Sequence, residues 1–289
     1  MFAGDAPRGP DAVDDAVDRI MDIGTLPQVA MRVLKVANND EAGTAELHQI
    51  VRTDPPLSAR LIRCVNSAAF GLRHPIRDLQ HAVTYLGFKE VRNLALTACV
   101  ADVFKTDDQI GPYSRTGLWR HMVSVAVCAR MIAARRKMPQ FEEAFLAGLL
   151  HDIGIILEDQ CFHAQFVTML ENLEPNKKLV DVEREHFGFD HTVLGHRLGE
   201  RWHFTEPALG AIRIHHSMDQ CEGEDGETIA CVDLANFICT VCGTTSVGLP
   251  LVDPPHRALA ILGIGRDDVK VIAEDLDGEL AQNQHLFVV

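Results

Sequence analysis

Apolar and polar residues alternate with a helical period along nearly the whole chain. Apolar positions recur every three or four residues, and the short alternating runs bounded by turns that mark strands are scarce. Residues 89–104 are an example, with Val91, Leu94, Ala98 and Val103 on one broad face. The pattern therefore predicts an all-α fold.

The first hundred residues predict a helical bundle. One helix should start at Thr25-Leu26-Pro27 and a second at Gly43. A third should start at Asp54-Pro55-Pro56 and stop at Gly71, and two more should cover residues 78–87 and 89–104. Asp54 can accept the first-turn amide hydrogens of its helix, and proline is tolerated at a helix start because its missing N–H has no partner there. Gly87 predicts a left-handed helix end.

Turn-rich segments divide the chain into regions. The polar stretch 107–117 contains glycine and proline and predicts a linker between two helical lobes. We therefore expect a flexible segment over residues 1–22, an N-terminal helical lobe over 23–110, a second helical lobe over 115–248 and a C-terminal helical tail over 249–289. In the tail, two short helices should meet at Gly263-Ile264-Gly265.

Composition excludes several classes of protein. The 289 residues carry a formal charge of -14, which argues against direct nucleic-acid binding and against adhesion to anionic lipid. No apolar run approaches the ~18 residues of a membrane span, and residues 1–20 lack the apolar core of a signal peptide. The eight cysteines are spread through apolar segments, which favours small packed thiols, including Cys239 and Cys242, and a cytoplasmic location.

Histidine and aspartate residues occur in unusually apolar surroundings. His121 shares a helix face with Val125, Cys128 and Ile132, and the pair His151-Asp152 interrupts the run AFLAGLLHDIGIIL. Other histidines and an aspartate in apolar surroundings stand in GFDHTVLGH, AIRIHH and IACVDLANFI. They are His191, His215, His216 and Asp233.

A bound metal ion would explain these placements. A buried carboxylate needs a cation, another partner or a proton, and imidazole and carboxylate are the ligand set of iron, manganese, zinc and nickel sites. One divalent ion, or two bridged by a carboxylate, would satisfy several groups at once. His196 is a weaker candidate. In the alternative interpretation, the histidines are core residues that hydrogen-bond one another.

The order of these motifs resembles a known family. His121, His151-Asp152 and Asp233 resemble the H…HD…D signature of the HD superfamily of metal-dependent phosphohydrolases. More specifically, IVRTDPPLSARLIRCVNSAAFG, IRDLQHAVTYLGFKEVRNLAL, GLLHDIGIIL and EREHFGFDHTVLGHRLGERW resemble, in order, the HDOD (HD-related output domain) family over about residues 26–247.

The resemblance implies a bacterial, cytoplasmic, all-α protein of signal transduction. It would have an N-terminal helical bundle packed on an HD-domain-like lobe and would act with other signalling proteins. Carried over position by position, His121, His151, Asp152 and Asp233 would hold a first metal. Asp152 would also bind a second metal, together with His191, His215 and His216. If the site is catalytic, Asp152 would be the residue that bridges the two metals. Arg120 and Arg213 flank these positions and are candidate phosphate-binding residues, although a solvated helix face is the plainer interpretation.

The chain departs from the related HD-GYP branch, which hydrolyses cyclic di-GMP. Ile155 stands where that branch carries a lysine, and HHSMDQCEGEDGETIA contains no GYP segment. The leading hypothesis is therefore a regulatory HDOD protein whose metal site binds a small phosphorylated ligand. The competing hypothesis is an active metal-dependent phosphohydrolase of nucleotides, cyclic nucleotides or phosphomonoesters.

Overall fold

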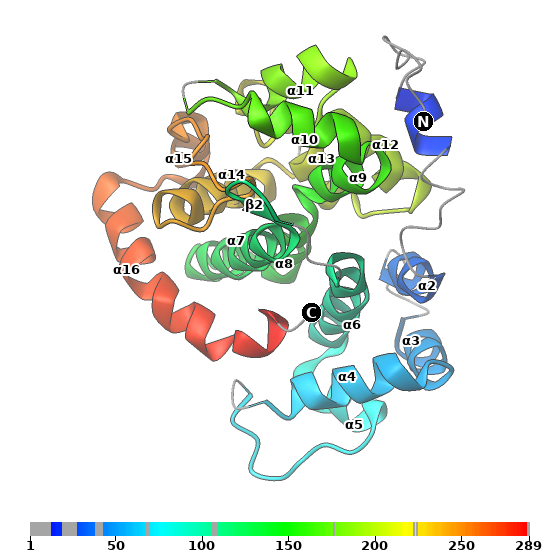
Figure 1. Cartoon of the computed structure of the whole chain (residues 1–289). Coiled ribbons are helices and arrows are strands. Elements are labelled where there is room, and N and C mark those ends of the chain that lie inside the picture. The colour runs from blue at the N-terminus through cyan, green and yellow to red at the C-terminus, as the bar shows by residue number, and fades with distance from the viewer. Residues whose placement is uncertain are drawn as a thin grey trace.

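The computed structural model is helical almost throughout and confirms the predicted all-α fold (Figure 1). It describes residues 13–18, 28–37, 43–67, 70–105, 109–175, 177–221, 223 and 225–287. Within the segment 1–22, residues 13–18 form a helix that buries Ala16 and Val17 and reaches α12 through Asp14 and Asp18. The other residues of that predicted flexible segment lie outside the described ranges.

The N-terminal lobe consists of the helices predicted from periodicity, with shifted ends. They are α2 (Gln28–Ala37), α3 (Gly43–Arg52), α4 (Pro55–Val65), α5 (Leu79–Leu86), α6 (Phe88–Val100) and the 3-10 turn η2 (Ala101–Phe104). As predicted, Asp54 accepts a hydrogen bond from the amide of Leu57. Gly87 ends α5 with φ of 87° but ψ of 160°, so the positive φ is as predicted and the full left-handed helical conformation is not.

Helix α4 ends five residues earlier than its sequence pattern suggests. The side chain of Asn66 donates to the carbonyl of Ile76 and accepts from its amide, both at 2.7 Å. These two bonds attach the following loop to the helix end, so Asn66 has the structural role that asparagine often takes at a helix terminus.

The predicted linker contains a small hairpin. Strands β1 (Gln109–Ile110) and β2 (Tyr113–Ser114) pair antiparallel around Gly111, and Ser114 then caps α7 by accepting from the amide of Gly117. The buried Tyr113 donates its hydroxyl to Asp159 of α9 at 2.8 Å. This tertiary contact explains why a segment with polar, turn-like composition is ordered.

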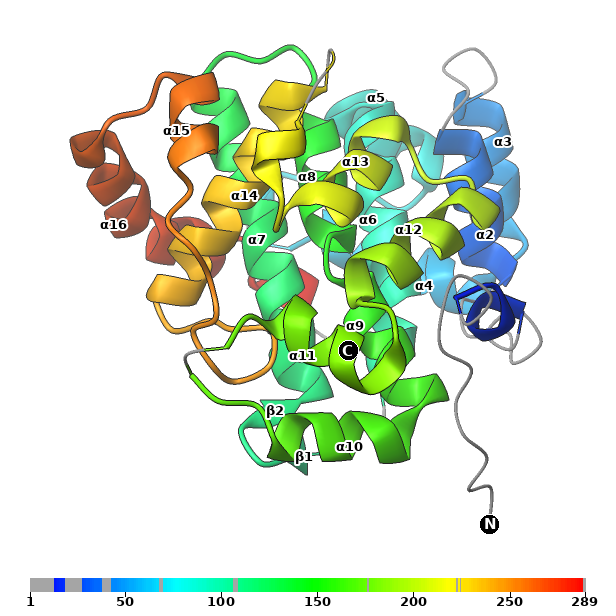
Figure 2. The same ribbon diagram turned by 90° about the horizontal axis from the view of Figure 1, so that it is seen from above.

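The second lobe and the tail complete the chain. The lobe comprises α7 (Arg115–Arg135), α8 (Phe141–Leu150), α9 (Ile153–Cys161), α10 (His163–Glu171), α11 (Leu179–Phe187), α12 (His191–Arg201), α13 (Glu206–Ile214), η3 (Met218–Gln220) and α14 (Gly226–Val241). The tail comprises α15 (His256–Leu262), α16 (Arg266–Gln282) and η4 (Gln284–Phe287). Figure 2 shows α15 and α16 at one edge and α2 and α3 at the opposite edge, with α7, α8 and α14 between them.

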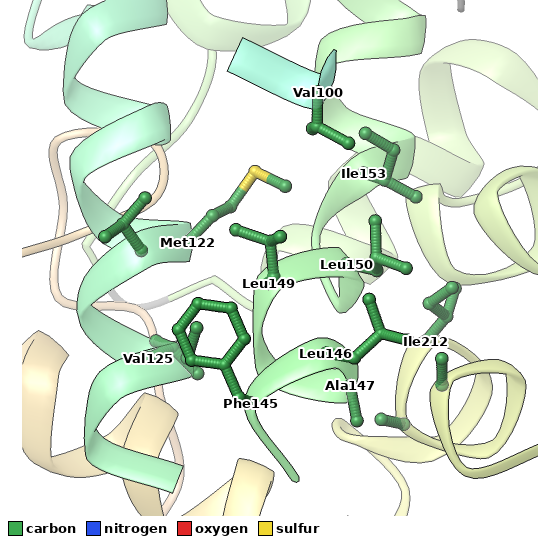
Figure 3. Packing of buried hydrophobic residues seen from close by; sticks show 14 of the residues in the cluster. Val100, Met122, Val125, Phe145, Leu146, Ala147, Leu149, Leu150, Ile153 and Ile212 are labelled. Carbon is green, nitrogen blue, oxygen red and sulfur yellow. The ribbon is translucent and has the colours of Figure 1, made fainter. Parts of the chain in front are cut away.

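Helix α8 lies at the centre of the packing. It contacts α6, α7, α13 and α14, and its apolar side chains meet those of the surrounding helices (Figure 3). The residues that interdigitate there are Leu146, Leu149 and Leu150 of α8, Met122 of α7, Ile153 of α9 and Ile212 of α13. Such packing fixes the direction of α8, whose last turn leads into His151 and Asp152.

The start of α8 joins the two lobes through buried polar groups. Arg92 of α6 contacts the carboxylate of Glu143 at 3.1 Å, and the amide of Asn93 donates to the side chain of Glu142 at 2.8 Å. Arg92 and Asn93 are each 1% exposed. A buried ion pair of this kind costs desolvation, so it fixes the relative placement of α6 and α8 more than it adds stability.

Two further predictions concerned the cysteines and the possibility of a membrane-spanning helix. None of the eight cysteines forms a disulfide in the described structure, and Cys239 is buried while Cys242 is exposed. Among the described residues, no helix has both the length and the apolar content needed to cross a bilayer. The boundaries predicted between the regions remain predictions.

Removing Arg92 should destabilise the fold. In Arg92→Met, Glu143 loses its closest cation while remaining buried, so we expect the free energy of unfolding to fall by about 3 kcal/mol. Urea titrations of the wild type and the variant measure this difference. Arg77→Met, at an exposed position of the same lobe, should change it by less than about 0.5 kcal/mol. Equal losses in the two variants would contradict the role of the pair.

The stability of the lobe junction should depend on pH through Glu142. Burial, with the facing carboxylate of Glu90, raises the pKa of Glu142 to about 7, against about 4.3 in an unfolded chain. Between these values the folded protein binds more protons than the unfolded chain, so the free energy of unfolding falls as pH rises. Wild type should therefore lose stability relative to Glu142→Gln between pH 5 and pH 8. Urea midpoints measure the trend, with Glu171→Gln as the exposed control; parallel curves for Glu142→Gln and wild type would refute it.

Candidate metal centre

Five histidines and one aspartate, far apart in the sequence, converge in the second lobe. Their ligand atoms form two groups, each with members within 4.8 Å of one another, and Asp152 belongs to both. The first group is His121, His151 and Asp152; the second is Asp152, His191, His215 and His216. All except His216 are buried.

His121 is oriented by the end of α14. Its Nδ1 lies 2.8 Å from the carbonyl oxygen of Thr244. That carbonyl is presented by a Schellman turn, in which the amide of Thr244 donates to Cys239 and the amide of Gly243 donates to Thr240. Gly243 has φ of 92°, which a residue with a side chain rarely adopts.

His151 and Asp152 lie in the tight turn between α8 and α9. Nδ1 of His151 lies 2.8 Å from the carbonyl of Gly148, one turn back in α8. Two residues later, a Cβ at Gly154 would stand 2.0 Å from the carbonyl oxygen of His191. The glycine of the HDIG run therefore lets the start of α9 approach the start of α12, which brings His191 toward Asp152.

His191 begins α12 and is held by two acidic residues. Asp190 caps the helix by accepting from the amides of Thr192 and Val193. Glu183 of α11 accepts from His191 twice, from its backbone amide at 3.1 Å and from Nδ1 at 2.7 Å. The carboxylate of Glu183 thus fixes both the position and the ring orientation of His191.

His215 and His216 follow the end of α13. Nδ1 of His215 lies 2.9 Å from the carbonyl of Ala211 in the last turn of the helix. The rings of His215 and His216 lie 4.1 Å apart between centroids, and His216 is the more accessible of the two. The helix end therefore directs His215 inward and leaves His216 toward the surface.

In four of the histidines, these contacts determine which ring nitrogen carries the proton. A carbonyl oxygen only accepts, so Nδ1 of His121, His151 and His215 must donate, and the carboxylate of Glu183 imposes the same on His191. The Nε2 atoms are then free to act as ligands. They surround Asp152: His121 and His151 lie 3.4 and 3.2 Å from Oδ2, and His191 and His215 lie 3.5 and 3.2 Å from Oδ1.

This donor set fits a metal ion. Within the described part of the chain, no hydrogen-bonding partner reaches Nε2 of His121, Nε2 of His151 or Oδ1 of Asp152, although all three atoms are buried. A cation between these atoms would turn each contact into a bond. Each carboxylate oxygen of Asp152 faces two imidazoles, which is the arrangement of a carboxylate that bridges two cation positions.

The charge states of Asp152, His151 and His216 suit metal ligands, whereas His191 holds its proton at neutral pH until a cation displaces it. Burial would raise the pKa of Asp152, yet the facing imidazoles hold it well below its usual range, so the carboxylate is ionised. Burial lowers the pKa of His151 and, with the neighbouring His215 and His191, that of His216, which favours their neutral forms. Burial would also lower the pKa of His191, but Glu183 and Asp152 raise it to about 9. The Glu183 carboxylate thus makes the His191 ring more basic.

A pocket of about 430 Å³ opens onto this cluster. His215 and His216 line it together with Asp233 and Phe237 of α14. Its lining also includes the basic residues Lys177, Lys178 and Arg257 and the acidic residues Asp219 and Asp253, and Lys178 pairs with Asp253 at 2.6 Å. A larger hollow of about 1020 Å³ lies at the lobe junction, but its lining includes none of the clustered histidines.

Three predicted residues lie outside the two groups. Asp233 lines the pocket, and its ligand atoms are not among those that lie within 4.8 Å of one another. Burial and the charge of Asp253 raise the pKa of Asp233 to about 7. Arg120 and Arg213 are exposed and do not line the pocket. The ligand role of Asp233 and the phosphate-binding role of the two arginines remain predictions.

Sequence reasoning missed the residues that support the ligands. Glu183 stands eight residues before His191, and the break between α11 and α12 lies between them, so no single helix period connects the two. The carbonyl of Thr244 has no signature beyond the CGT turn that presents it. Lys177 and Lys178 stand in a loop and Arg257 at the start of α15, and only the pocket shows that they share one lining.

Removing the carboxylate behind His191 should weaken metal binding. In Glu183→Gln, the imidazole loses its charged acceptor, so we expect metal affinity to fall by about 10- to 100-fold. Competition with a chromophoric chelator measures this with Mn²⁺ or Zn²⁺. Glu185→Gln, on the exposed side of the same helix, is the matched control and should bind as the wild type does. Unchanged affinity in Glu183→Gln would show that the contact does not support a ligand.

Comparisons with known proteins agree with the fold. The HDOD domain model matches residues 23–218. An uncharacterized protein of Treponema pallidum (strain Nichols) is 26% identical over 227 residues, which are 76% of this chain and 42% of that protein. The chain therefore spans less than half the length of this relative.

Two crystal structures share the architecture. One is an HDOD domain protein with unknown function from Geobacter sulfurreducens, 25% identical, with a TM-score of 0.73 and coverage of 94% of this chain and 97% of that one. The other is a putative phosphohydrolase from Shewanella amazonensis SB2B, 22% identical, with a TM-score of 0.72 and the same coverage. With the family model matching well over half of its length, this chain belongs to the HDOD family.

Proposed function

We propose that this chain is a regulatory HDOD protein that holds one or two divalent transition-metal ions and binds a small phosphorylated ligand beside them. The convergence of four imidazole Nε2 atoms on the buried carboxylate of Asp152 carries the proposal. His121, His151 and Oδ2 of Asp152 would hold one ion. His191, His215, His216 and Oδ1 would hold the other. Imidazole and carboxylate donors suit iron, manganese, zinc or nickel.

The pocket supports a phosphorylated ligand. His215 and His216 line it, so a ligand inside it would lie against the second metal position. Lys177 and Arg257 supply positive charge for phosphate oxygens beside the acidic lining residues Asp219, Asp233 and Asp253. Phe237 with Leu251 supplies an apolar wall. Charged groups beside an apolar wall fit a ligand that has a phosphate and an organic part.

The second candidate function is hydrolysis of a phosphoester. A divalent metal supplies an activated water and stabilises negative charge on phosphoryl oxygens. The protein would contribute the orientation of the ester in the pocket and the exclusion of water by the packed helices around Asp152. Ile155, at the position where the HD-GYP branch carries lysine, is fully buried and offers no cation, which argues against cyclic di-GMP as the substrate.

A role in signal transduction, with other signalling proteins as partners, is the context that family membership suggests. The Treponema relative extends well beyond the matched region, so this unit can operate within longer chains. We infer that the metal-bearing lobe responds to its ligand and that the N-terminal lobe, joined to it at the start of α8, transmits the response.

Metal analysis and a turnover screen test the proposal together. Wild type loaded with Mn²⁺ or Fe²⁺ should retain stoichiometric metal after desalting, whereas Asp152→Asn should lose most of it because both groups lose their shared ligand. Asp267→Asn, an exposed control, should bind as the wild type does. Loading should raise the melting temperature, since an ion that binds only the folded state stabilises it.

The outcomes separate the candidates. Absence of stoichiometric metal in a folded wild type would refute the metal site. Metal with saturable binding of inorganic phosphate, but no hydrolysis of nucleotides, cyclic dinucleotides or p-nitrophenyl phosphate, supports the regulatory role. Turnover that vanishes in Asp152→Asn and survives in Asp267→Asn supports the enzyme.

A further inference from the structure

The hollow at the lobe junction is a second cavity, separate from the metal centre. Its volume is about 1020 Å³, and none of the clustered histidines lines it. Its lining residues come from the ranges 86–90 in the N-terminal lobe, 127–142 in the second lobe and 279–283 in the tail, together with Phe70. We call it the junction cavity. It is large enough for a small organic molecule, which would contact both lobes and the tail at once.

Much of the wall of the junction cavity is apolar and aromatic. Phe70, Phe88 and Phe141 line it from three separate segments of the chain, and the side chain of Phe141 is 39% exposed. Aliphatic residues such as Leu86 and Met131 fill the wall between them. An exposed aromatic ring at a cavity wall offers a ligand both apolar area and a negatively polarised face.

The basic residues of this wall are already paired. Nη1 of Arg130 donates to both oxygens of Glu90, at 3.2 and 3.1 Å, and Nη2 donates to Asn283 at 3.0 Å. An anionic ligand would have to break such a pair to gain a counter-charge. The other two basic residues are paired as well, Arg135 with Asp275 at 2.6 Å and Lys89 with Glu143 at 3.7 Å.

Glu142, by contrast, lacks a full counter-charge. Its residue is 9% exposed and lines the cavity, and its Oε2 accepts from the amide of Asn93 at 2.8 Å. Its Oε1 lies 3.9 Å from Nη1 of Arg130, and that nitrogen is already bound to Glu90. Two buried carboxylates therefore share one guanidinium group, and Glu279 adds a third acidic side chain to the wall.

We propose that the junction cavity binds a small organic ammonium ion, with its charged group between Glu90 and Glu142 and its apolar body against the phenylalanines. An ammonium group donates strong hydrogen bonds to carboxylates and is attracted to aromatic faces, so one ligand matches both features of the wall. The proposal goes beyond the metal site and does not rest on it.

The ionisation of Glu142 agrees with a missing cation. Burial, followed by the neighbouring carboxylate of Glu90, raises the pKa of Glu142 to about 7, and Arg130 offsets this only in part. A buried carboxylate is stabilised by a second cation within hydrogen-bonding reach. An ammonium ion in the cavity would supply that cation in place of the proton.

Three probes of similar shape and different charge test the ligand class. At pH 8, where Glu142 is mostly ionised, 2-phenylethylammonium should bind wild type at least about tenfold more tightly than the neutral 2-phenylethanol or the anionic 3-phenylpropanoate, because it adds a hydrogen bond between charged groups. Isothermal titration calorimetry measures the three dissociation constants. The ammonium probe should also raise the melting temperature, since it binds the folded state.

Two substitutions locate the binding site. Glu142→Gln keeps the shape of the side chain but removes its charge, so the ammonium probe should bind about tenfold more weakly. Phe141→Leu keeps an apolar side chain but removes the ring, and should weaken the ammonium probe about threefold. The matched controls are Glu171→Gln on α10 and Tyr85→Leu, whose side chain is 57% exposed; neither position lines the cavity, and both variants should bind as the wild type does.

Several outcomes would overturn the proposal. One is equal or tighter binding of the alcohol or the carboxylate, and another is the absence of saturable binding of all three probes. Unchanged ammonium affinity in Glu142→Gln would place the probe elsewhere, as would equal losses in the cavity variants and their controls. If Phe141→Leu does not fold, as judged by circular dichroism, Glu142→Gln still decides. A wild type that binds no metal would refute the proposed metal site and leave this result unaffected.

Discussion

The structure of the second lobe depends on one constraint, the ionised carboxylate of Asp152 held almost entirely out of water. It is 2% exposed and is surrounded by the Nε2 atoms of four imidazoles, whose Nδ1 atoms already donate to other groups. Such a cluster is stable only when positive charge lies within it. The Schellman turn at Thr244, the close approach at Gly154 and the Glu183 carboxylate each direct a ring toward this point, and the proposed metal function follows from their agreement.

Helix α8 connects this centre with the rest of the molecule. Its first turn carries Glu142 and Glu143, which meet Asn93 and Arg92 of the N-terminal lobe, and its last turn leads to His151. At 1.5 Å per residue, about 13 Å of rigid, fully packed helix separates the two ends. A shift of the lobe junction and a change at the metal centre would therefore be mechanically linked. This link gives physical content to a regulatory role in which one lobe binds and the other responds.

Much of the site could be predicted from the sequence because each ligand carries a local signal. A histidine on an apolar helix face, as at position 121, or an HD pair within an apolar run must lie in the interior, and interior polar groups seek one another. Periodicity does not say how far a side chain reaches, however. Asp233 also interrupts an apolar helix, yet it lines the pocket, and Arg120 and Arg213 flank ligands in the sequence while pointing to solvent. Neighbours along a helix diverge by about 100° per residue, so adjacency in sequence is poor evidence of adjacency in space.

The sequence by itself determined the helical class, most helix positions, the resemblance to HDOD proteins and the set of buried imidazoles, because amphipathic period, capping residues and short motifs are local properties. Tertiary structure alone decided the hairpin at residues 109–114, which is held by Tyr113 and Asp159, and the early end of α4 at Asn66. It also decided the ring orientations of the candidate ligands and the set of residues that line the pocket. Each of these depends on which atoms distant parts of the chain bring within about 3 Å of one another, a distance that packing sets.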